Sequence, residues 1–203
     1  MTRTQIDRFF RVLAEQRGEK TVVLLTGAAA AAIWGHVRPS VDIDFAVRVR
    51  KRGRSVWEKL EDAIGRTVRL TGIQANYAED IDRWGSITLL DYRRHTRPYR
   101  RFGPLEVRLL DPAYWSIGKM TRYLDPDVRD MIQVFKRQRV PARRLTRLWG
   151  KALKRSPRSL ALSQFRRQVE HFVRSYGRTI WGRKFAPEQA LRYFYKEAGI
   201  TPP

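Results

Sequence analysis

The sequence contains no cysteine, which excludes disulfide bonds, thiolate metal ligands and cysteine nucleophiles. It has only three histidines, His36, His95 and His171, and their scatter along the chain does not indicate a histidine metal site. No run of about 18 apolar residues occurs, which predicts that no segment spans a membrane. The first residues also lack the apolar stretch of a signal peptide. We therefore expect a soluble protein of the cytoplasm.

Acidic residues are scarce toward the C-terminus. The 203 residues include 42 Lys and Arg but only 20 Asp and Glu, giving a formal net charge of +22. Residues 131–203 hold 18 of the basic residues and only three of the acidic ones, so this segment alone carries +15. Arginine, whose planar guanidinium suits phosphate, accounts for 33 of the cations. The shortage of acids predicts a polyanionic partner. The alternative is a solvated surface on a protein from a GC-rich genome, and such a genome bias explains the preference for arginine but not the missing acids.

Hydrophobic periodicity predicts an α+β fold, a mixed sheet flanked by helices, followed by a helical part. Helices are predicted over 4–17, 28–35 and 54–65, and strands over 22–25, 42–49, 68–73, 87–90 and 105–109. The last two strands are expected to pair across a basic loop over 92–103. Further helices are predicted over 112–123, 126–138, 142–154, 160–177 and 187–198. We predict two domains, an α+β head over 1–110 and a strongly basic helical part over 111–203.

An aspartate precedes each of the helices predicted over 112–123 and 126–138. Asp111 and Asp125 each precede a proline, so each is expected to cap the N-terminus of a helix whose first residue is that proline.

The residues best suited to chemistry lie between positions 24 and 45. The predicted strand ends at Gly27, where a helix begins, and Ala28 is small enough to let a phosphate approach the helix N-terminus. Asp42 and Asp44 lie two residues apart in the next strand, so both project from one face of the sheet. Adjacent carboxylates repel each other unless a cation lies between them. Hard oxygen ligands beside a phosphate site are what Mg²⁺ bound to a nucleoside triphosphate requires.

This order and spacing resembles the polymerase-β-like nucleotidyltransferase superfamily, and in particular the small bacterial nucleotidyltransferases of abortive-infection and toxin–antitoxin systems. The resemblance is carried by the segment Leu24 to Ala28, the segment Arg38 to Phe45, and the later residues Lys119, Arg122, Asp127 and Asp130. It covers residues 22 to about 135 and implies a nucleotidyltransferase-like sheet.

The resemblance also implies roles for individual residues. Asp42 and Asp44 are expected to hold Mg²⁺ or Mn²⁺ across the triphosphate of a bound NTP. A third carboxylate would bind one metal and act as general base; Asp91 is the first candidate, because an acid that ends an apolar strand reaches a sheet edge, and Glu106 is the second. Contacts to the nucleotide are expected from Gly27, Ala28, Arg38, Ser40, Lys119, Arg122 and Asp130.

One position departs from the family pattern. Family members usually carry Gly or Ser where this chain has Ala28. The serine hydroxyl is absent, so one hydrogen bond to a charged oxygen, worth about 1.5–3 kcal/mol, is lost.

The basic C-terminal part is not assigned by the resemblance. On the predicted helix 142–154, five cations lie mostly opposite the apolar stripe and are our candidates for binding nucleic acid: Arg143, Arg144, Arg147, Lys151 and Lys154. This surface would repel a cationic small molecule but would attract RNA through its phosphates. The segment 93–102 adds cations interleaved with aromatic side chains, a composition that suits unpaired RNA ends.

The sequence therefore predicts a Mg²⁺-dependent nucleotidyltransferase that moves a nucleoside monophosphate from an NTP to RNA. A tRNA 3′ end is one candidate acceptor, and a toxin–antitoxin or phage-defence role implies a cognate toxin or antitoxin protein as a partner. Two alternatives stay open: a catalytically degenerate member that only binds nucleic acid, as an antitoxin or regulator, and a transferase that modifies a protein side chain.

Overall fold

The structure, a computed structural model, describes residues 1–36, 38–49, 53–79, 81, 83–84, 87–88 and 91–202. The chain divides into two compact units. The N-terminal unit comprises Met1–Ile81 and Thr96–Leu110, and the C-terminal unit comprises Asp82–His95 and Asp111–Pro203. We predicted a single break after residue 110, whereas the segment Asp82–His95 groups with the helices. Contacts distant in sequence explain this grouping, since the Thr88 amide donates to Ser156 Oγ at 2.8 Å.

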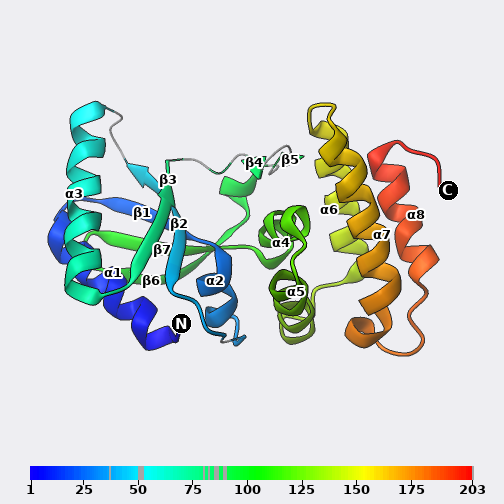
Figure 1. Ribbon diagram of the computed structural model, residues 1–203, viewed down its shortest axis with the longest axis horizontal. Helices are drawn as coiled ribbons and strands as arrows, with labels where there is room; N and C mark the ends of the chain where they lie inside the picture. The colour runs from blue at the N-terminus through cyan, green and yellow to red at the C-terminus, as the bar shows by residue number, and fades with distance from the viewer. Residues whose placement is uncertain are drawn as a thin grey trace. The chain divides into compact units, whose positions relative to one another are not determined.

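The N-terminal unit is built on a five-stranded mixed sheet of order β3-β2-β1-β7-β6 (Figure 1). β1 pairs antiparallel with β2 and parallel with β7, β3 lies parallel to β2, and β6 lies antiparallel to β7. Its elements are α1 (Arg3–Arg17), β1 (Thr21–Leu25), α2 (Gly27–Ile33), β2 (Asp42–Val49), α3 (Arg54–Thr71), β3 (Gln74–Ala78), β6 (Thr96–Phe102) and β7 (Leu105–Leu110). The predicted α+β class with a sheet flanked by helices is confirmed.

The two faces of this sheet differ because side chains alternate along β2. Phe45 points to the face covered by α1, where its ring centroid lies 5.9 Å from that of Phe9 and 5.7 Å from that of Phe10. Asp42 and Asp44 therefore point to the opposite face, where α2 packs (Figure 1). The pair of acids is thus kept apart from the aromatic core.

The helix α3 is longer than predicted, and the strand predicted over 68–73 is wrong. The helix does not end at Gly65, because buried residues continue at helical spacing through Thr67 to Thr71. It ends at Gly72, which has φ +71° and caps the helix in the left-handed conformation. The strand that follows, β3, begins only at Gln74.

The segment predicted as a basic loop over 92–103 is also regular. It contains a 3₁₀ turn, η1 (Tyr92–Arg94), and the edge strand β6. Because β7 pairs with β6 and β1, the expected pairing of the strands over 105–109 and 87–90 is wrong. The charged composition of β6 resembles that of a loop. On an edge strand, however, charged side chains commonly protect against pairing with a strand of another molecule.

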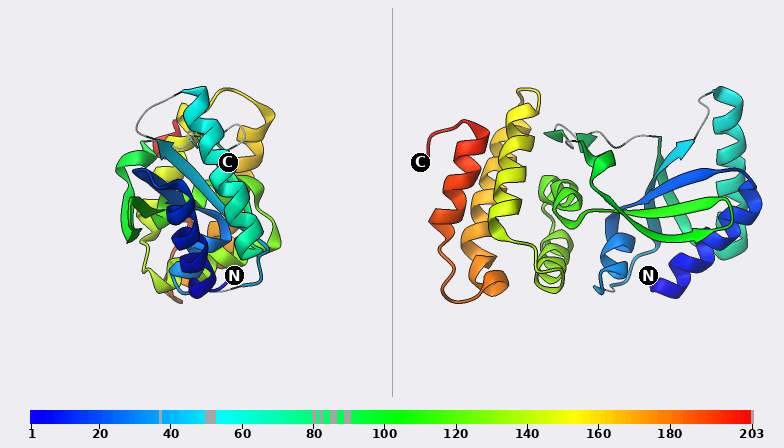
Figure 2. Two further views of the ribbon diagram at one scale, coloured as in Figure 1. Left: turned by 90° about the vertical axis from the view of Figure 1, so that its left-hand side faces the viewer. Right: turned by 180° about the vertical axis from the view of Figure 1, so that it is seen from behind.

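The C-terminal unit is helical, and Figure 2 shows α6, α7 and α8 side by side. Its elements are β4 (Arg83–Trp84), β5 (Ile87–Thr88), η1, α4 (Pro112–Arg122), α5 (Asp125–Arg137), α6 (Ala142–Arg155), α7 (Leu160–Trp181) and α8 (Pro187–Ala198). All five predicted helices are confirmed. β5 pairs with β4, and Leu89 and Leu90 of the strand predicted over 87–90 lie outside the described residues. Across the part of the chain described, no helix is long and apolar enough to cross a bilayer.

The two predicted aspartate caps have different outcomes. Asp111 caps α4 as expected, because its side chain accepts a hydrogen bond from the Ala113 amide at 3.0 Å. Asp125 instead lies inside the first turn of α5, and the capping position is occupied by Leu124.

Aromatic side chains fill the core of the C-terminal unit. The ring of Phe172 meets those of Phe135 and Trp149 edge to face, at 6.0 and 5.9 Å between centroids. The buried indole of Trp149 donates to Ser116 Oγ at 2.9 Å, so its polar atom is satisfied. These contacts join α4, α5, α6 and α7.

The helices α6 and α8 approach closely at Gly150. A Cβ on this residue would lie 2.5 Å from the backbone oxygen of Phe194 and 2.9 Å from Glu197 Cβ. Backbone atoms cannot move aside as a flexible side chain does, so this crossing requires glycine.

We expect Gly150→Ala to lower the free energy of unfolding by about 2 kcal/mol, because the added methyl overpacks the crossing of α6 and α8. The matched control is Gly65→Ala within α3, where the nearest atom in reach, Arg69 Nη1, lies 3.8 Å away. That variant should gain about 0.5–1 kcal/mol from helix propensity. Chemical denaturation followed by circular dichroism measures both, and shifts of the same sign would contradict the close approach.

Candidate functional site

The turn between β1 and α2 lies directly against the carboxylate of Asp44. Gly27 has φ +59°, which favours glycine, and a Cβ at this position would overlap the Asp44 side chain. The Thr26 amide and hydroxyl both donate to the backbone oxygen of Asp44, at 2.9 and 3.3 Å. The strand end, the glycine and the acid are therefore held together as one local structure.

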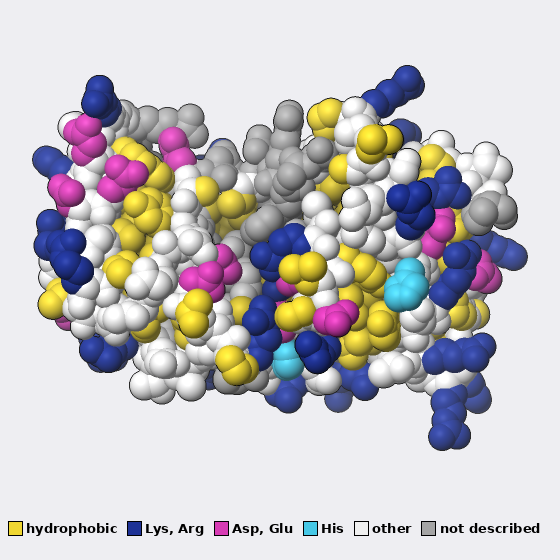
Figure 3. Space-filling view, in the orientation of Figure 1, with side chains coloured by type: hydrophobic (Ala, Val, Ile, Leu, Met, Phe, Trp, Pro, Cys, Tyr) yellow, Lys and Arg dark blue, Asp and Glu magenta, His cyan; other side chains and the backbone are white. Residues whose placement is uncertain are grey.

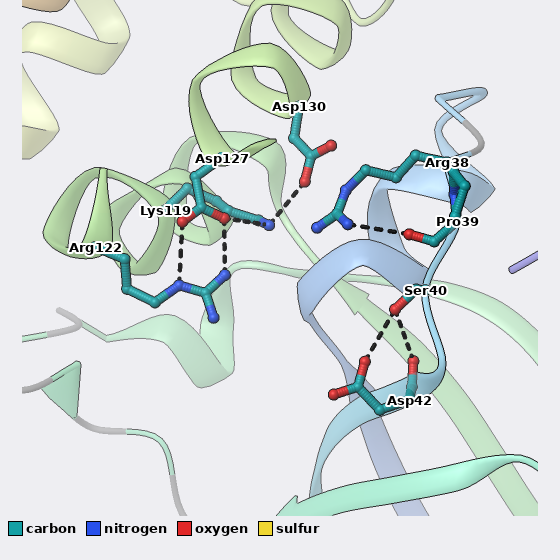
Figure 4. Close-up of polar contacts among 8 residues, drawn as sticks. All are labelled: Arg38, Pro39, Ser40, Asp42, Lys119, Arg122, Asp127 and Asp130. Carbon is teal, nitrogen blue, oxygen red and sulfur yellow. Dashed lines mark hydrogen bonds and ion pairs between the residues drawn. The ribbon is translucent and has the colours of Figure 1, made fainter. Parts of the chain in front are cut away.

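Asp42 and Asp44 converge on a single nitrogen atom. Asn76 Nδ2 lies 2.7 Å from Asp42 Oδ2 and 3.3 Å from Asp44 Oδ1. Asn76 is the register partner of Asp44 in the adjacent strand β3, so its side chain projects from the same face of the sheet. Ser40 Oγ donates to Asp42 Oδ1 at 2.9 Å and so orients the carboxylate of Asp42 (Figure 4).

This donor set fits a divalent cation. Mg²⁺ is commonly held by one or two carboxylates together with the phosphates of a substrate. Asn76 carries an acceptor oxygen as well as a donor nitrogen, so a rotated amide presents a third oxygen to the same point. Within the described ranges no group of three or more His, Asp and Glu suits a metal. The protein ligands that the described residues of β2 and β3 offer at this point are thus two carboxylates and an amide.

Glu106, the second candidate for a third carboxylate, is distant from Asp44. The sheet register places Glu106 level with Val22 of β1, and Val22 level with Arg48 of β2. Arg48 lies four residues from Asp44, roughly 13 Å along the strand. Glu106 is instead held by Arg108 Nη1 at 2.7 Å, and this hydrogen bond lowers the pKa of the carboxyl below its usual value. Glu106 cannot share a metal with Asp44 in this sheet.

Asp91, the first candidate, belongs to the C-terminal unit. It is exposed and adopts the left-handed conformation, with φ +34°, immediately before η1. Its role as a metal ligand and general base beside Asp42 and Asp44 stays a prediction.

The other residues expected to contact the nucleotide in the N-terminal unit have varied surroundings. Ala28 is buried in the first turn of α2, a helix of only seven residues. Ser40 orients Asp42, as described above. Arg38 Nη1 donates to the Pro39 oxygen at 3.2 Å, and the Arg38 carbonyl accepts from the Met1 ammonium at 2.7 Å. Their contacts to a nucleotide stay predictions.

The second group of predicted residues forms a buried ion-pair network between α4 and α5. Lys119 Nζ lies 2.8 Å from Asp127 Oδ1 and 2.8 Å from Asp130 Oδ2, and all three side chains are at most 3% exposed (Figure 4). Arg122 makes a forked contact with Asp127, at 2.7 and 3.2 Å. The sequence pattern grouped these residues as one motif without predicting their ion pairs, and the network fastens α4 to α5. Contacts of Lys119, Arg122 and Asp130 to a nucleotide stay predictions.

This network lowers the pKa of Asp127. Burial opposes ionisation, but the hydrogen bonds and charges of Lys119 and Arg122 outweigh it and hold the pKa of Asp127 below its ordinary value of 3.8. An acid with a depressed pKa stabilises the fold above its ordinary pKa and loses that contribution as the pH falls through the lower, folded value.

A groove of about 1030 Å³ lies within the C-terminal unit. We call it the cationic groove, and its charged lining consists of Arg143, Arg144, Arg147, Lys151, Lys154, Arg155, Asp91 and Glu197. All five cations predicted to bind nucleic acid therefore lie along one surface. On the face shown in Figure 3, Lys and Arg side chains also project from the region of α7 and α8, and both acidic and basic side chains lie over α3.

Sequence reasoning missed two features of these sites. Asn76 was overlooked because a strand was assigned to 68–73, although Gln74 and Asn76 alternate with Ala75 and Tyr77 directly after Gly72. The second feature is a stacked pair of rings, His95 and Tyr114, whose centroids lie 4.2 Å apart with planes inclined by 12°. No local pattern signals this pair, because the two residues belong to different elements.

Comparisons with protein-family profiles, with curated proteins and with solved structures found no match to this chain. The resemblance to nucleotidyltransferases therefore stays a prediction from the motif residues.

We expect Asn76→Asp to make the fold more dependent on Mg²⁺. A third carboxylate beside Asp42 and Asp44 adds repulsion of about 1 kcal/mol, which lowers Tm without metal. Bound Mg²⁺ stabilises the folded state, so Tm should rise more on addition of MgCl₂ than it does in the wild type. Asn76→Ala is the control, since it removes the amide without adding charge. An equal response of the two variants to Mg²⁺ in thermal denaturation would argue against a cation site here.

We expect Asp127→Asn to lower the free energy of unfolding by about 2 kcal/mol at neutral pH, because Lys119 and Arg122 lose a negative charge and one of the two acceptor oxygens that they share. The deficit relative to wild type should stay constant down to about pH 4 and shrink at lower pH, where the wild-type carboxyl is itself protonated. Urea denaturation across this pH range measures it. Asp125→Asn, at an exposed position, is the control and should show no comparable deficit.

Proposed function

We propose that this protein is a Mg²⁺-dependent nucleotidyltransferase of the polymerase-β-like type, which transfers a nucleoside monophosphate from an NTP to an RNA hydroxyl. The observation that carries the proposal is the convergence of Asp42 and Asp44 on one point, with Asp44 packed against the Gly27 turn. Such an arrangement suits a cation shared between protein carboxylates and phosphates.

The residues of the N-terminal unit have distinct tasks in this proposal. Asp42 and Asp44 hold the divalent ion together with the amide oxygen of Asn76, and Ser40 keeps the carboxylate of Asp42 in position. Gly27 leaves the space that Asp44 occupies. A divalent ion bound here supplies electrostatic stabilisation of the charge on the triphosphate.

The order of the elements in the N-terminal unit supports the proposed function. A strand, a glycine turn, a short helix and a second strand with alternate aspartates follow one another as the resemblance implies. The neighbouring strands β1 and β2 bring the turn and the aspartates together. A nucleotidyltransferase-like sheet is therefore part of the proposal.

The reaction joins the acceptor to the α-phosphorus of the NTP. An acceptor hydroxyl oxygen forms the new P–O bond, the bond from the α-phosphorus to the β-phosphate oxygen breaks, and pyrophosphate leaves. The hydroxyl proton passes to a general base, for which Asp91 is the candidate.

Charge favours RNA as the acceptor. The chain carries +22, and the C-terminal unit contains a groove with six basic side chains and two acidic ones. A polyanion gains from such a surface, whereas a cationic small molecule is repelled. We propose tRNA as one such acceptor, a cognate toxin or antitoxin as a protein partner, and the cytoplasm as the location.

A second candidate function has one observation in its favour. Lys119, Arg122, Asp127 and Asp130 are satisfied by one another, so a purely structural role accounts for them. A member of the family that binds RNA without catalysis would keep this network and the cationic groove.

The test is incubation of the purified protein with labelled NTPs, Mg²⁺ and total RNA. We expect label in RNA, and we expect Asp44→Asn to reduce it at least about 100-fold, because a metal ligand supplies several kcal/mol of charge stabilisation. Asp62→Asn is the matched control: it is an exposed acid on α3, and transfer should be unchanged.

Other results separate the alternatives. Label in protein in place of RNA identifies a protein-modifying transferase, and no label with any NTP supports the member that only binds RNA. Undiminished transfer by Asp44→Asn would reject the assignment of the metal ligands.

A further inference from the structure

The cationic groove combines a row of positive charges with an exposed aromatic ring. We propose that it binds an unpaired stretch of RNA, whose phosphates lie along α6 and one of whose bases stacks on His95. Naming that strand as the acceptor rests on the proposed function, but the binding itself requires neither NTP nor metal.

The charges of the groove are only partly neutralised by the protein. Arg144 is paired with Asp111 at 2.8 Å, and Arg147 with Glu197 at 2.6 Å. The remaining four cations make no ion pair with any residue that the structure describes: Arg143, Lys151, Lys154 and Arg155. An excess of positive charge on a concave surface attracts a polyanion.

The cations also have a linear arrangement. Arg143, Arg147, Lys151 and Lys154 recur at intervals of three or four residues, so they follow one side of α6. They span roughly 17 Å at the rise of an α-helix. Arg143 is steadied by Tyr193, whose ring centroid lies 4.7 Å from the guanidinium carbon. A row of this kind follows a single extended phosphate backbone.

His95 provides a surface for a base. One side of its ring is stacked on Tyr114, which is buried, while His95 itself is exposed and lines the groove. Its backbone is fixed on both sides, because the His95 amide donates to the Tyr92 oxygen at 2.9 Å and its carbonyl accepts from the Asp111 amide at 2.8 Å. The ring is thus preorganised. Bases inside a duplex stack on each other, so only an unpaired base can use it.

The lining argues against a membrane surface as the partner. Membrane-bound cationic surfaces place large apolar side chains beside the charges. Among the residues that line this groove, Leu148 is the one aliphatic side chain apart from Pro141, and Leu148 is buried.

The experiment is fluorescence anisotropy with the full-length protein, without NTP or Mg²⁺, across a series of salt concentrations. The probes are a labelled, unstructured RNA oligonucleotide and a blunt RNA duplex of the same length. We expect tighter binding of the single strand.

Paired variants test the row of cations. Lys151→Gln with Lys154→Gln should raise Kd for the single strand about tenfold and reduce the slope of log Kd against log salt by about 1.4, which corresponds to two phosphate contacts. The control is Arg167→Gln with Arg178→Gln. It removes the same charge from exposed positions on α7 outside the groove, and Kd should change little.

Two variants of His95 test the stacking. His95→Ala should raise Kd for the single strand about tenfold, whereas His95→Phe, which keeps a ring but not the imidazole, should bind nearly as well as wild type. Neither should alter Tm appreciably, since the side chain is exposed. An equal loss in both variants would overturn the stacking role.

Several further outcomes would overturn the proposal. One is an equal loss of affinity in the double variant of Lys151 and Lys154 and in the double variant of Arg167 and Arg178. The others are binding of the duplex as tight as that of the single strand, and equally tight binding to vesicles containing anionic lipid. Failure of the proposed function has a different signature: the protein binds the single strand through the groove but transfers no label. Transfer of label with no effect of the groove variants on binding would reject only this inference.

Discussion

Repulsion between two neighbouring carboxylates is the constraint on which the site in the N-terminal unit depends. Strand periodicity forces Asp42 and Asp44 onto the same face of β2, where like charges disfavour each other. The surrounding residues relieve this repulsion by aiming donors at the acids. Asn76 donates to both carboxylates, Ser40 donates to Asp42, and the glycine turn at Gly27 leaves room for the side chain of Asp44.

The C-terminal unit solves the same problem in a different way. Asp127 and Asp130 also project from one helix face, but the ammonium of Lys119 lies between them, so the compensating cation is part of the chain. The atom that the structure places between Asp42 and Asp44 is Nδ2 of Asn76, which belongs to a neutral amide. An acid pair bridged by a lysine is suited to fastening two helices, whereas two carboxylates and an amide offer oxygen ligands of the kind that Mg²⁺ uses. The proposed metal site is therefore assigned to β2.

The distribution of charge links that proposed chemistry to a partner. Acids occur mainly in the N-terminal part of the chain, and the few near α6 neutralise only Arg144 and Arg147. The rest of the positive row is available to phosphates, while the core of the unit rests on aromatic rings such as Trp149 and Phe172. Packing of the core and the proposed binding of RNA therefore use opposite sides of the same helix.

Residues 111–203 were predictable because amphipathic helices are encoded locally, at a spacing that can be read along the chain. Asp42, Asp44 and Gly27 were predictable for the same reason, as strand alternation and a turn residue are local features. Strand partners were not, since hydrogen bonds between strands join residues far apart in sequence. Asn76, the exclusion of Glu106 and the stacking of His95 on Tyr114 all follow from such distant contacts. The sequence by itself thus determined the elements and the chemistry available, and only the tertiary structure decided which side chains meet, because meeting depends on register and packing.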